Sequence, residues 1–363
     1  MASAPAGLLL AAAEQARGGT PSGEVLASEV RMRFNRFTAC IIGVWFGLVA
    51  GCSSESSQIP AGSPESAFAK VHHNSWSLKK PIPTAVLCST TAAIGSKIYV
   101  VGGVDSSLNI LGNNQIYDTA TNTWSKGKAM TTPRWCGGAA VVNGILYVIG
   151  GNTSLSGASS VVEAYDPKHN SWSEKAPLPS PDGPVTVTES GLIYALGGYS
   201  AGSGRLASVY LYNPKSNAWT TRQSMKMGRS NPAAGASGKE IVVADGLTNS
   251  GVTTEAEVYN AQTNRWRTVK SNATARTAGC SAVIGGKLYF AGGELGGGSQ
   301  PDTNVAEAYD IGMNSWTSKA KMLQATVAPG FATVGGLLYC ISGASSGNPN
   351  GATFYKATQV YQP

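Results

Sequence analysis

Three short segments carry an arginine at a comparable point before an apolar stretch. They read TTPRWCG, MGRSNPA and TARTAGC, and they contain Arg134, Arg229 and Arg276. A guanidinium group presents its N–H donors as a planar fork and binds a carboxylate through two parallel hydrogen bonds. If these side chains share one opening, they would bind a carboxylate or a sugar acid. The alternative is that they make structural bonds to neighbouring backbone, and the sequence leaves both interpretations open.

Other polar and aromatic residues near these segments complete the set of candidates for ligand binding. Trp135 could stack on the face of a sugar ring, and Asn231 lies two positions after Arg229. The candidates in Gly-rich loops are Arg205, Glu294 and Asp302. Glu294 is the candidate acid or base if the protein is an enzyme, although acidic residues in such loops are more often simply solvated.

The sequence lacks the residues for several other kinds of chemistry. Its only histidines are His72, His73 and His169, and it has no paired-cysteine spacing; this disfavours a zinc site. It contains no nucleophile elbow and no P-loop. The net charge of +7 comes from scattered lysines and arginines without a basic run, which disfavours nucleic acid as a partner. We therefore expect neither a metal nor another cofactor.

The elements that position these candidates repeat along the chain with a period near fifty residues. The repeat tryptophans are Trp76, Trp124, Trp172, Trp219, Trp266 and Trp316, at intervals of 48, 48, 47, 47 and 50 residues. An asparagine stands two positions before each, and a tyrosine stands seven positions before all but the first. Each unit also has a glycine after an apolar strand, at Gly103, Gly151, Gly198, Gly246, Gly293 and Gly343. Such a glycine is needed where φ is positive or where another backbone approaches closely.

An apolar strand ending in Gly-Gly, followed by Tyr and seven residues later by Trp, resembles the kelch repeat. The resemblance covers residues 71–363 and implies an all-β fold, a six-bladed β-propeller with one four-stranded blade per repeat. The residues agree with it, because one such sheet cannot bury both its faces, whereas six sheets stacked radially can. We expect the repeat tryptophans to fill the space between blades rather than to form binding platforms on the surface.

The first and last segments of residues 71–363 each contain only part of a repeat, and together they make up one blade. The C-terminal unit supplies only three strands, so residues 74–80 should form its fourth, outer strand and close the ring. Closure of this kind covers two otherwise exposed sheet edges. Length variation is confined to the loops between second and third strands, and the resemblance implies that these loops and the outer-to-inner connections emerge on one face. Variable loops on a rigid scaffold are where recognition usually occurs.

Two functions fit this architecture. The first is a non-catalytic binding module for a protein or a glycan. The second comes from a resemblance to six-bladed kelch mutarotases of sialic acid: a mutarotase or epimerase of an acidic sugar, with Glu294 as acid or base and arginines orienting the carboxylate. Copper radical oxidases with kelch domains need two ring histidines, and the positions of the three histidines here rule out such a site.

The N-terminal sequence predicts targeting of the protein to a membrane. Residues 32–51 place two arginines before an apolar stretch from about Phe37 to Ala50, which is typical of a secretory signal and too short to span a bilayer. The stretch ends in LVAGC, which resembles the lipobox of bacterial lipoproteins and implies a lipid on Cys52. Ser53 after this cysteine resembles the pattern of outer-membrane lipoproteins.

These features divide the chain into four parts. We expect residues 1–31 to be a misassigned upstream extension, 32–51 a signal peptide, 52–70 a flexible tether behind the lipidated Cys52, and 71–363 the propeller. The predicted location is the bacterial cell envelope, at the outer membrane, facing the periplasm or the surface. We expect a monomer that contacts the membrane only through its lipid.

Four cysteines follow Cys52, namely Cys88, Cys136, Cys280 and Cys340. Cys88 and Cys136 each lie 14 residues before a glycine pair, at equivalent places in adjacent units. The oxidising envelope permits a disulfide there. The sequence does not decide the pairing, and buried free thiols are the default expectation.

Overall fold

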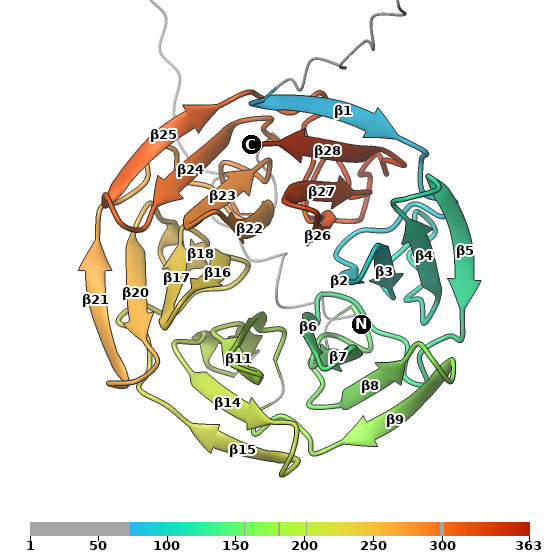
Figure 1. Cartoon of the computed structure of the whole chain (residues 1–363), viewed down its shortest axis with the longest axis horizontal. Helices are drawn as coiled ribbons and strands as arrows, with labels where there is room; N and C mark the ends of the chain where they lie inside the picture. The colour runs from blue at the N-terminus through green and yellow to red at the C-terminus, as the bar shows by residue number, and fades with distance from the viewer. Residues whose placement is uncertain (1–72, 156, 181, 201, 298–300) are drawn as a thin grey trace, which may run out of the picture. The chain divides into compact units, whose positions relative to one another are not determined.

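The computed structural model describes residues 73–363 except 156, 181, 201 and 298–300. This part of the chain forms six antiparallel four-stranded sheets that surround a central axis, the arrangement of a six-bladed β-propeller (Figure 1). It contains no helix that is long and apolar enough to cross a membrane. The expected all-β propeller is therefore confirmed, while the predictions for residues 1–72, including Cys52, concern residues outside the described part of the chain.

Each blade runs from an inner strand at the axis to an outer strand on the circumference. The first two blades are β2 (Thr90–Ile94), β3 (Lys97–Val101), β4 (Asn114–Asp118) and β5 (Thr123–Gly127), then β6 (Gly138–Val142), β7 (Ile145–Ile149), β8 (Val162–Asp166) and β9 (Ser171–Lys175). The third and fourth are β10 (Val185–Glu189), β11 (Leu192–Leu196), β14 (Val209–Asn213) and β15 (Ala218–Thr221), then β16 (Ala233–Ser237), β17 (Glu240–Ala244), β20 (Ala256–Asn260) and β21 (Arg265–Val269). The fifth is β22 (Cys280–Ile284), β23 (Lys287–Ala291), β24 (Ala306–Asp310) and β25 (Ser315–Lys319).

The sixth blade joins the two ends of the described chain. It consists of β26 (Gly330–Val334), β27 (Leu337–Ile341), β28 (Thr358–Gln362) and, as its outer strand, β1 (Ser75–Lys79). Trp76 on β1 lies opposite Tyr361 on β28. The predicted closure by residues 74–80 is confirmed.

The local sequence explains why these strands form. The second strand of each blade is buried over most of its length, as in Ile145–Ile149, because neighbouring blades cover both of its faces. The turn before it contains Asn143 and Gly144, which both have positive φ (52° and 76°). This is the geometry that a two-residue hairpin loop requires.

Two consecutive positions follow each second strand, and they differ in how strongly the backbone conformation requires glycine. The first position has φ between 59° and 71°, the ordinary left-handed region, so Asp245 and Ser342 can occupy it. The second has φ between 93° and 113°, which a side chain strongly disfavours. A Cβ on Gly151 would also lie 2.7 Å from the carbonyl oxygen of Trp135. The second position is therefore glycine in all six units.

Each repeat tryptophan and its asparagine hold one residue of the preceding blade by its backbone. In the second blade, the side-chain oxygen of Asn170 accepts a hydrogen bond from the N–H of Lys128 (2.7 Å), and the Nε1–H of Trp172 donates to the carbonyl oxygen of the same residue (2.8 Å). The hydroxyl of Tyr165 donates to the same asparagine oxygen (2.7 Å). We call this arrangement the amide clamp, because it binds both ends of one residue's backbone.

The amide clamp occurs at all six blade boundaries. The clamped residues are Lys80, Lys128, Ala176, Gln223, Lys270 and Ala320, held in order by Asn122, Asn170, Asn217, Asn264, Asn314 and Asn74 with the tryptophans two positions later. All six asparagines have φ between 47° and 56°, a conformation that asparagine tolerates better than most residues. Asn74 closes the ring from the N-terminal strand.

Apolar side chains fill the space between neighbouring blades, on the axial side of each amide clamp. Between the second and third blades, Tyr147 and Ile149 pack against Ile193 and Tyr212, and the half-buried Trp219 covers the cluster. The ring centroids of Tyr147 and Tyr212 lie 5.8 Å apart. The tryptophans are thus interblade residues, as expected, with part of each ring exposed at the circumference.

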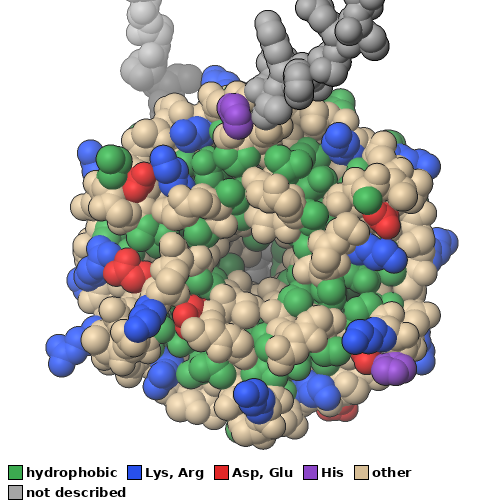
Figure 2. Space-filling model, in the orientation of Figure 1, with side chains coloured by type: hydrophobic (Ala, Val, Ile, Leu, Met, Phe, Trp, Pro, Cys, Tyr) green, Lys and Arg blue, Asp and Glu red, His purple; other side chains and the backbone are tan. Residues whose placement is uncertain are grey.

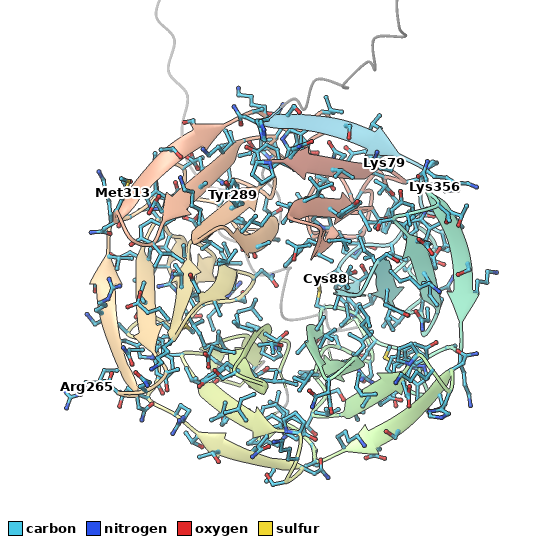
Figure 3. The ribbon with its side chains drawn as sticks, in the orientation of Figure 1. Lys79, Cys88, Arg265, Tyr289, Met313 and Lys356 are labelled. Carbon is cyan, nitrogen blue, oxygen red and sulfur yellow. A yellow bond between two sulfur atoms is a disulfide. The ribbon has the colours of Figure 1, made fainter. Side chains whose placement is uncertain are left out.

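A smaller set of bonds links the blades near the axis. The N–H of Cys136 donates to the carbonyl of Cys88, the N–H of Cys88 to that of Ala328, and the N–H of Ala328 to that of Ala278 (2.7–2.8 Å). The predicted free thiols are wrong: Cys88 pairs with Cys136, and Cys280 pairs with Cys340. Each disulfide joins neighbouring blades, and Cys88 lies beside the central channel in Figure 3.

We predict that the stability of the propeller depends on the clamp tryptophans. Trp172→Ala should lower the free energy of unfolding by about 3 kcal/mol, the lower end for a buried aromatic since this ring is half exposed. Trp172→Phe keeps a ring but loses the N–H donor and should cost about 1 kcal/mol. Denaturant unfolding measures both, with the exposed Ser173→Ala as the control. Equal stability of Trp172→Ala and the parent would show that the interblade role is wrong.

Candidate functional site

The face of the propeller that carries the variable loops is hollowed at its centre. On this face five of the six outer-to-inner connections pair with the segment after a second strand, for instance Trp135 with Asn152 and Thr277 with Glu294. The resulting cavity has a volume of about 490 Å³, within the range of small-molecule sites. We call it the mouth cavity.

Two short hairpins in the third and fourth blades form one side of the mouth cavity. They are β12 (Tyr199–Ser200) with β13 (Gly204–Arg205), and β18 (Leu247–Thr248) with β19 (Gly251–Val252). The side chain of Asn249 accepts a hydrogen bond from the N–H of Arg205 (3.0 Å) and so connects the two hairpins. Sequence reasoning noted that these loops vary but missed Tyr199 and Asn249, because neither belongs to the repeat.

Arg205 is the cationic group of the mouth cavity. Its guanidinium carbon lies 5.1 Å from the centroid of the Tyr199 ring, a cation–π distance. Burial lowers the pKa of Arg205, and Tyr199 opposes this shift. Among the described residues, the guanidinium has no hydrogen-bond or ion-pair partner. The Nε is buried, but the residue is only half-buried and lines the cavity, so a ligand can reach the guanidinium through its terminal N–H groups.

Glu294 is the carboxylate of the mouth cavity. It lines the cavity but is only 2 % exposed, and its Oε2 accepts a hydrogen bond from the N–H of Gly347 (3.3 Å). Asp302 pairs with Glu294 through the backbone and accepts a hydrogen bond from the Tyr355 hydroxyl (3.3 Å). Asp302 does not itself line the cavity.

Trp135 and Asn231 also line the mouth cavity. The Trp135 ring is 3 % exposed, its Nε1–H donates to the carbonyl of Ser154 (3.1 Å), and it packs against Leu87 and Val104. It supplies an apolar wall and cannot offer a ring face for stacking. The structure thus brings together four of the predicted residues, namely Trp135, Arg205, Asn231 and Glu294.

The three arginines of the outer-to-inner connections do not reach the mouth cavity. Arg134, Arg229 and Arg276 are fully buried and pair with Glu163, Glu257 and Glu307 on the third strands of their own blades. Burial lowers the pKa of Arg134 and Arg229, while the paired glutamates oppose the shift. A buried guanidinium needs such a partner. The expected ring of ligand-binding arginines is therefore wrong, and the structural alternative is correct for these residues.

A signal for these ion pairs was present in the sequence. Glutamate occupies the second position of the third strand only in the three blades that have the arginine. The other blades have Gln115, Tyr210 and Gln359 there, and Val86, Asp182 and Thr326 at the arginine position. Comparing the repeats with one another would have linked each arginine to its glutamate.

The third blade carries an unpaired carboxyl group at the arginine position. The carbonyl of Asp182 accepts the hydrogen bond of Gly151, just as that of Arg134 accepts the bond of Gly103. The carboxyl is 1 % exposed, and neither of its oxygens has a partner among the described residues. Burial raises the pKa of Asp182 to about 8. The group is therefore mostly neutral at pH 7.

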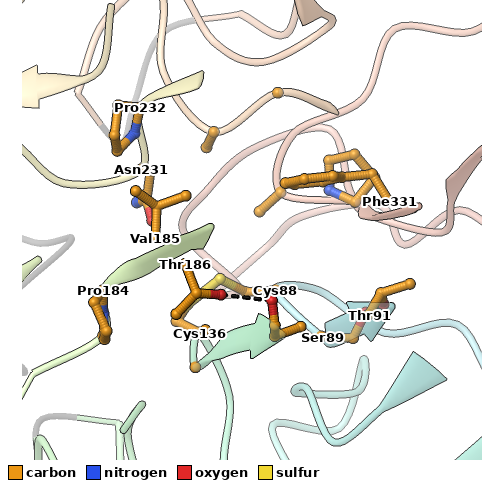
Figure 4. Close-up of a pocket in the computed structure, with 18 residues that line it drawn as sticks. Cys88, Ser89, Thr91, Cys136, Pro184, Val185, Thr186, Asn231, Pro232 and Phe331 are labelled. Atoms are coloured by element: carbon orange, nitrogen blue, oxygen red, sulfur yellow. Dashed lines mark hydrogen bonds between the residues drawn. A yellow bond between two sulfur atoms is a disulfide. The ribbon is translucent and has the colours of Figure 1, made fainter. Parts of the chain in front are cut away.

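The central channel holds a second, smaller cavity of about 120 Å³ (Figure 4). It is lined by small and polar side chains such as Thr91 and Thr186, with Phe331 on one side and the Cys88–Cys136 disulfide on another. A central opening is visible in the space-filling view (Figure 2). No group of three or more His, Cys, Asp or Glu side chains suited to a metal occurs within the described part of the chain.

Comparison with known proteins gives a match for most of the chain. A family model described as the KLHDC2/KLHL20/DRC7 Kelch-repeats domain matches residues 38–246 and 139–334. Among solved structures, the structure of YjhT is similar with a TM-score of 0.66 and 17 % identity, covering 78 % of this chain and 97 % of that one. At this identity the likeness shows the fold alone. No curated protein matches the chain.

We predict that Asp182 makes stability fall as pH rises. Its folded pKa of about 8 lies above the ordinary aspartate pKa of 3.8, so its contribution to the free energy of unfolding is full below about pH 4 and is lost as pH rises to about 8. The loss within this window is on the order of 1 kcal/mol per pH unit. Asp182→Asn should flatten the dependence of the unfolding free energy on pH, with the exposed Glu174→Gln as control. The same slope in Asp182→Asn and the parent would contradict this assignment.

Proposed function

The chain belongs to the kelch-repeat family, and from this premise we propose that it is a non-catalytic binding module whose mouth cavity holds the end of an anionic glycan. The observation that carries the proposal is the unpaired guanidinium of Arg205 at this cavity. A ligand carboxylate would supply the missing acceptor through two parallel hydrogen bonds. The hairpin that holds Arg205 is one of the loops between second and third strands, whose length varies among the six blades, and recognition is expected in such loops.

The rest of the lining supports a glycan over a protein. Asn231 and Asn249 offer neutral amide groups to sugar hydroxyls, and Tyr199 also lines the cavity. The concave shape and volume suit one or two sugar rings, whereas a protein partner would need a larger and flatter surface. Among the described residues no histidine lines this cavity, and Cys88 and Cys136 in its wall are joined as a disulfide.

One observation favours a second candidate, a mutarotase or epimerase of an acidic sugar. Glu294 and Arg205 line the same cavity. A carboxylate can transfer a proton at the anomeric centre while a guanidinium orients the sugar carboxylate. The two candidates use the same residues, so they differ in turnover and not in the site.

We further propose that the protein acts at the bacterial envelope, anchored as a monomer through a lipid on Cys52. The proposal is supported by the lipobox-like sequence before Cys52 and by two disulfides, which persist in oxidising compartments. Cell fractionation of Cys52→Ser tests it. The variant should move from the membrane to the soluble fraction.

We predict that binding of acidic sugars depends on Arg205. On an array of sialylated, uronate-bearing and neutral glycans, the parent should retain acidic glycans, and Arg205→Ala should weaken this binding at least about tenfold, the size of a lost charge-assisted pair. The exposed Lys239→Gln is the charge control. Equal binding of neutral glycans, or no effect of Arg205→Ala, would contradict the proposal.

The same samples separate binding from catalysis. Proton NMR of a dissolved anomer of sialic acid measures the rate at which the anomers interconvert. The binding module predicts the uncatalysed rate in the presence of protein. Fast interconversion that is lost in Glu294→Gln would instead establish the mutarotase.

A further inference from the structure

The circumference of the propeller is basic, although the basic residues are scattered in the sequence. The six outer strands with the two residues after each carry eleven lysines and arginines and a single acidic residue, Glu174. Figure 2 shows Lys and Arg side chains distributed around the rim of the ring. The fold thus gathers charges that the sequence alone does not connect.

Five of the six outer strands, all except β9 with Glu174, have no acidic residue, and three of these five lie around the N-terminal end of the described chain. The outer strands β25, β1 and β5 are neighbours along the rim (Figure 1). With the two residues after each strand, they carry the lysines Lys319, Lys321, Lys79, Lys80, Lys126 and Lys128. We call these three strands and their following residues the basic sector. None of its lysines has an ion-pair partner among the described residues.

Exposed apolar side chains lie in and beside the basic sector. The four exposed large hydrophobic residues of the described chain are Leu78, Leu295, Met313 and Leu323. Leu78 is on β1 and is 60 % exposed, while Met313 and Leu323 flank β25. Single exposed leucines need no explanation; Leu78 adds one apolar side chain to the basic sector, whose main feature is its unpaired lysines.

The chain enters the propeller at this same place. His73 lies against the C-terminus, with its Nδ1 2.9 Å from the carbonyl oxygen of Pro363, and β1 follows two residues later. The proposed lipid site, Cys52, is about twenty residues upstream. The flexible tether proposed from the composition of residues 52–70 would have a root-mean-square span of about 25 Å. A lipid on Cys52 would therefore hold the basic sector closer to the membrane than the opposite side of the ring.

From these observations we infer that the basic sector docks on the anionic phospholipid headgroups of the membrane that carries the lipid anchor. The inference rests on the proposed envelope location and adds a second membrane contact to it. Juxtamembrane lysines strengthen binding to anionic lipid by roughly fivefold each. Docking through the circumference would stand the propeller on its edge and leave the mouth cavity open to the side.

Vesicle binding of the full chain tests this contact without the lipid. The chain with Cys52→Ser is sedimented with phosphatidylcholine vesicles, and with vesicles that contain about one third phosphatidylglycerol, at low and high salt. The test variant carries Cys52→Ser and four further substitutions, Lys79→Gln, Lys80→Gln, Lys319→Gln and Lys321→Gln. The control variant adds Lys97, Lys168, Lys215 and Lys239→Gln, which changes the net charge equally at exposed sites outside the sector. Thermal unfolding verifies that both variants are folded.

The expected result is binding that needs phosphatidylglycerol and weakens with salt. The test variant should bind the anionic vesicles at least about tenfold more weakly than the parent, and the control variant should stay within about twofold. Equal losses in both variants, or equal binding to the neutral vesicles, would overturn the inference. None of the four test lysines lines the mouth cavity, and the anchor is absent from all samples. Failure here is thus distinguishable from failure of glycan binding or of lipid anchoring.

Discussion

The architecture of this propeller depends on the amide clamp at each blade boundary. A four-stranded blade leaves the backbone groups of its outer strand without a partner, and at the end of that strand an asparagine oxygen and a tryptophan N–H from the next blade bind both groups of one residue, as at Lys128. The asparagine needs positive φ, and the tyrosine hydroxyl orients its oxygen. The repeated Tyr, Asn and Trp are thus parts of one interaction.

The ring is fixed at its circumference and near its axis, so the loops between second and third strands can differ in length and sequence from blade to blade. The inner backbone bonds and the Cys88–Cys136 disulfide hold the axis, while buried pairs such as Arg229–Glu257 hold three of the six connections against their blades. None of these needs the loops between second and third strands. Those loops can therefore extend into the hairpins that place Arg205 beside the cavity and confine recognition to one face.

The fold could be predicted from the sequence because its determinants repeat, whereas the site could be predicted only in part because its determinants do not. Six copies of Trp and Gly gave the blade number and the closure by residues 74–80. Arg134 was misassigned because spacing gives a position along the chain and not the side on which a guanidinium is buried. Arg205 and Glu294 were found as charged loop residues, while Tyr199 was missed because an aromatic residue in a loop carries no signal of its own.

The most direct measurement of the central claim is amide hydrogen exchange at the six clamped residues. The N–H groups of Lys80, Lys128, Ala176, Gln223, Lys270 and Ala320 lie at the exposed circumference, yet each donates to an asparagine side chain. The amide clamp predicts that all six exchange as slowly as amides of the inner strands, because they open only when blades separate. Exchange at the rate of a solvent-exposed loop would contradict the account.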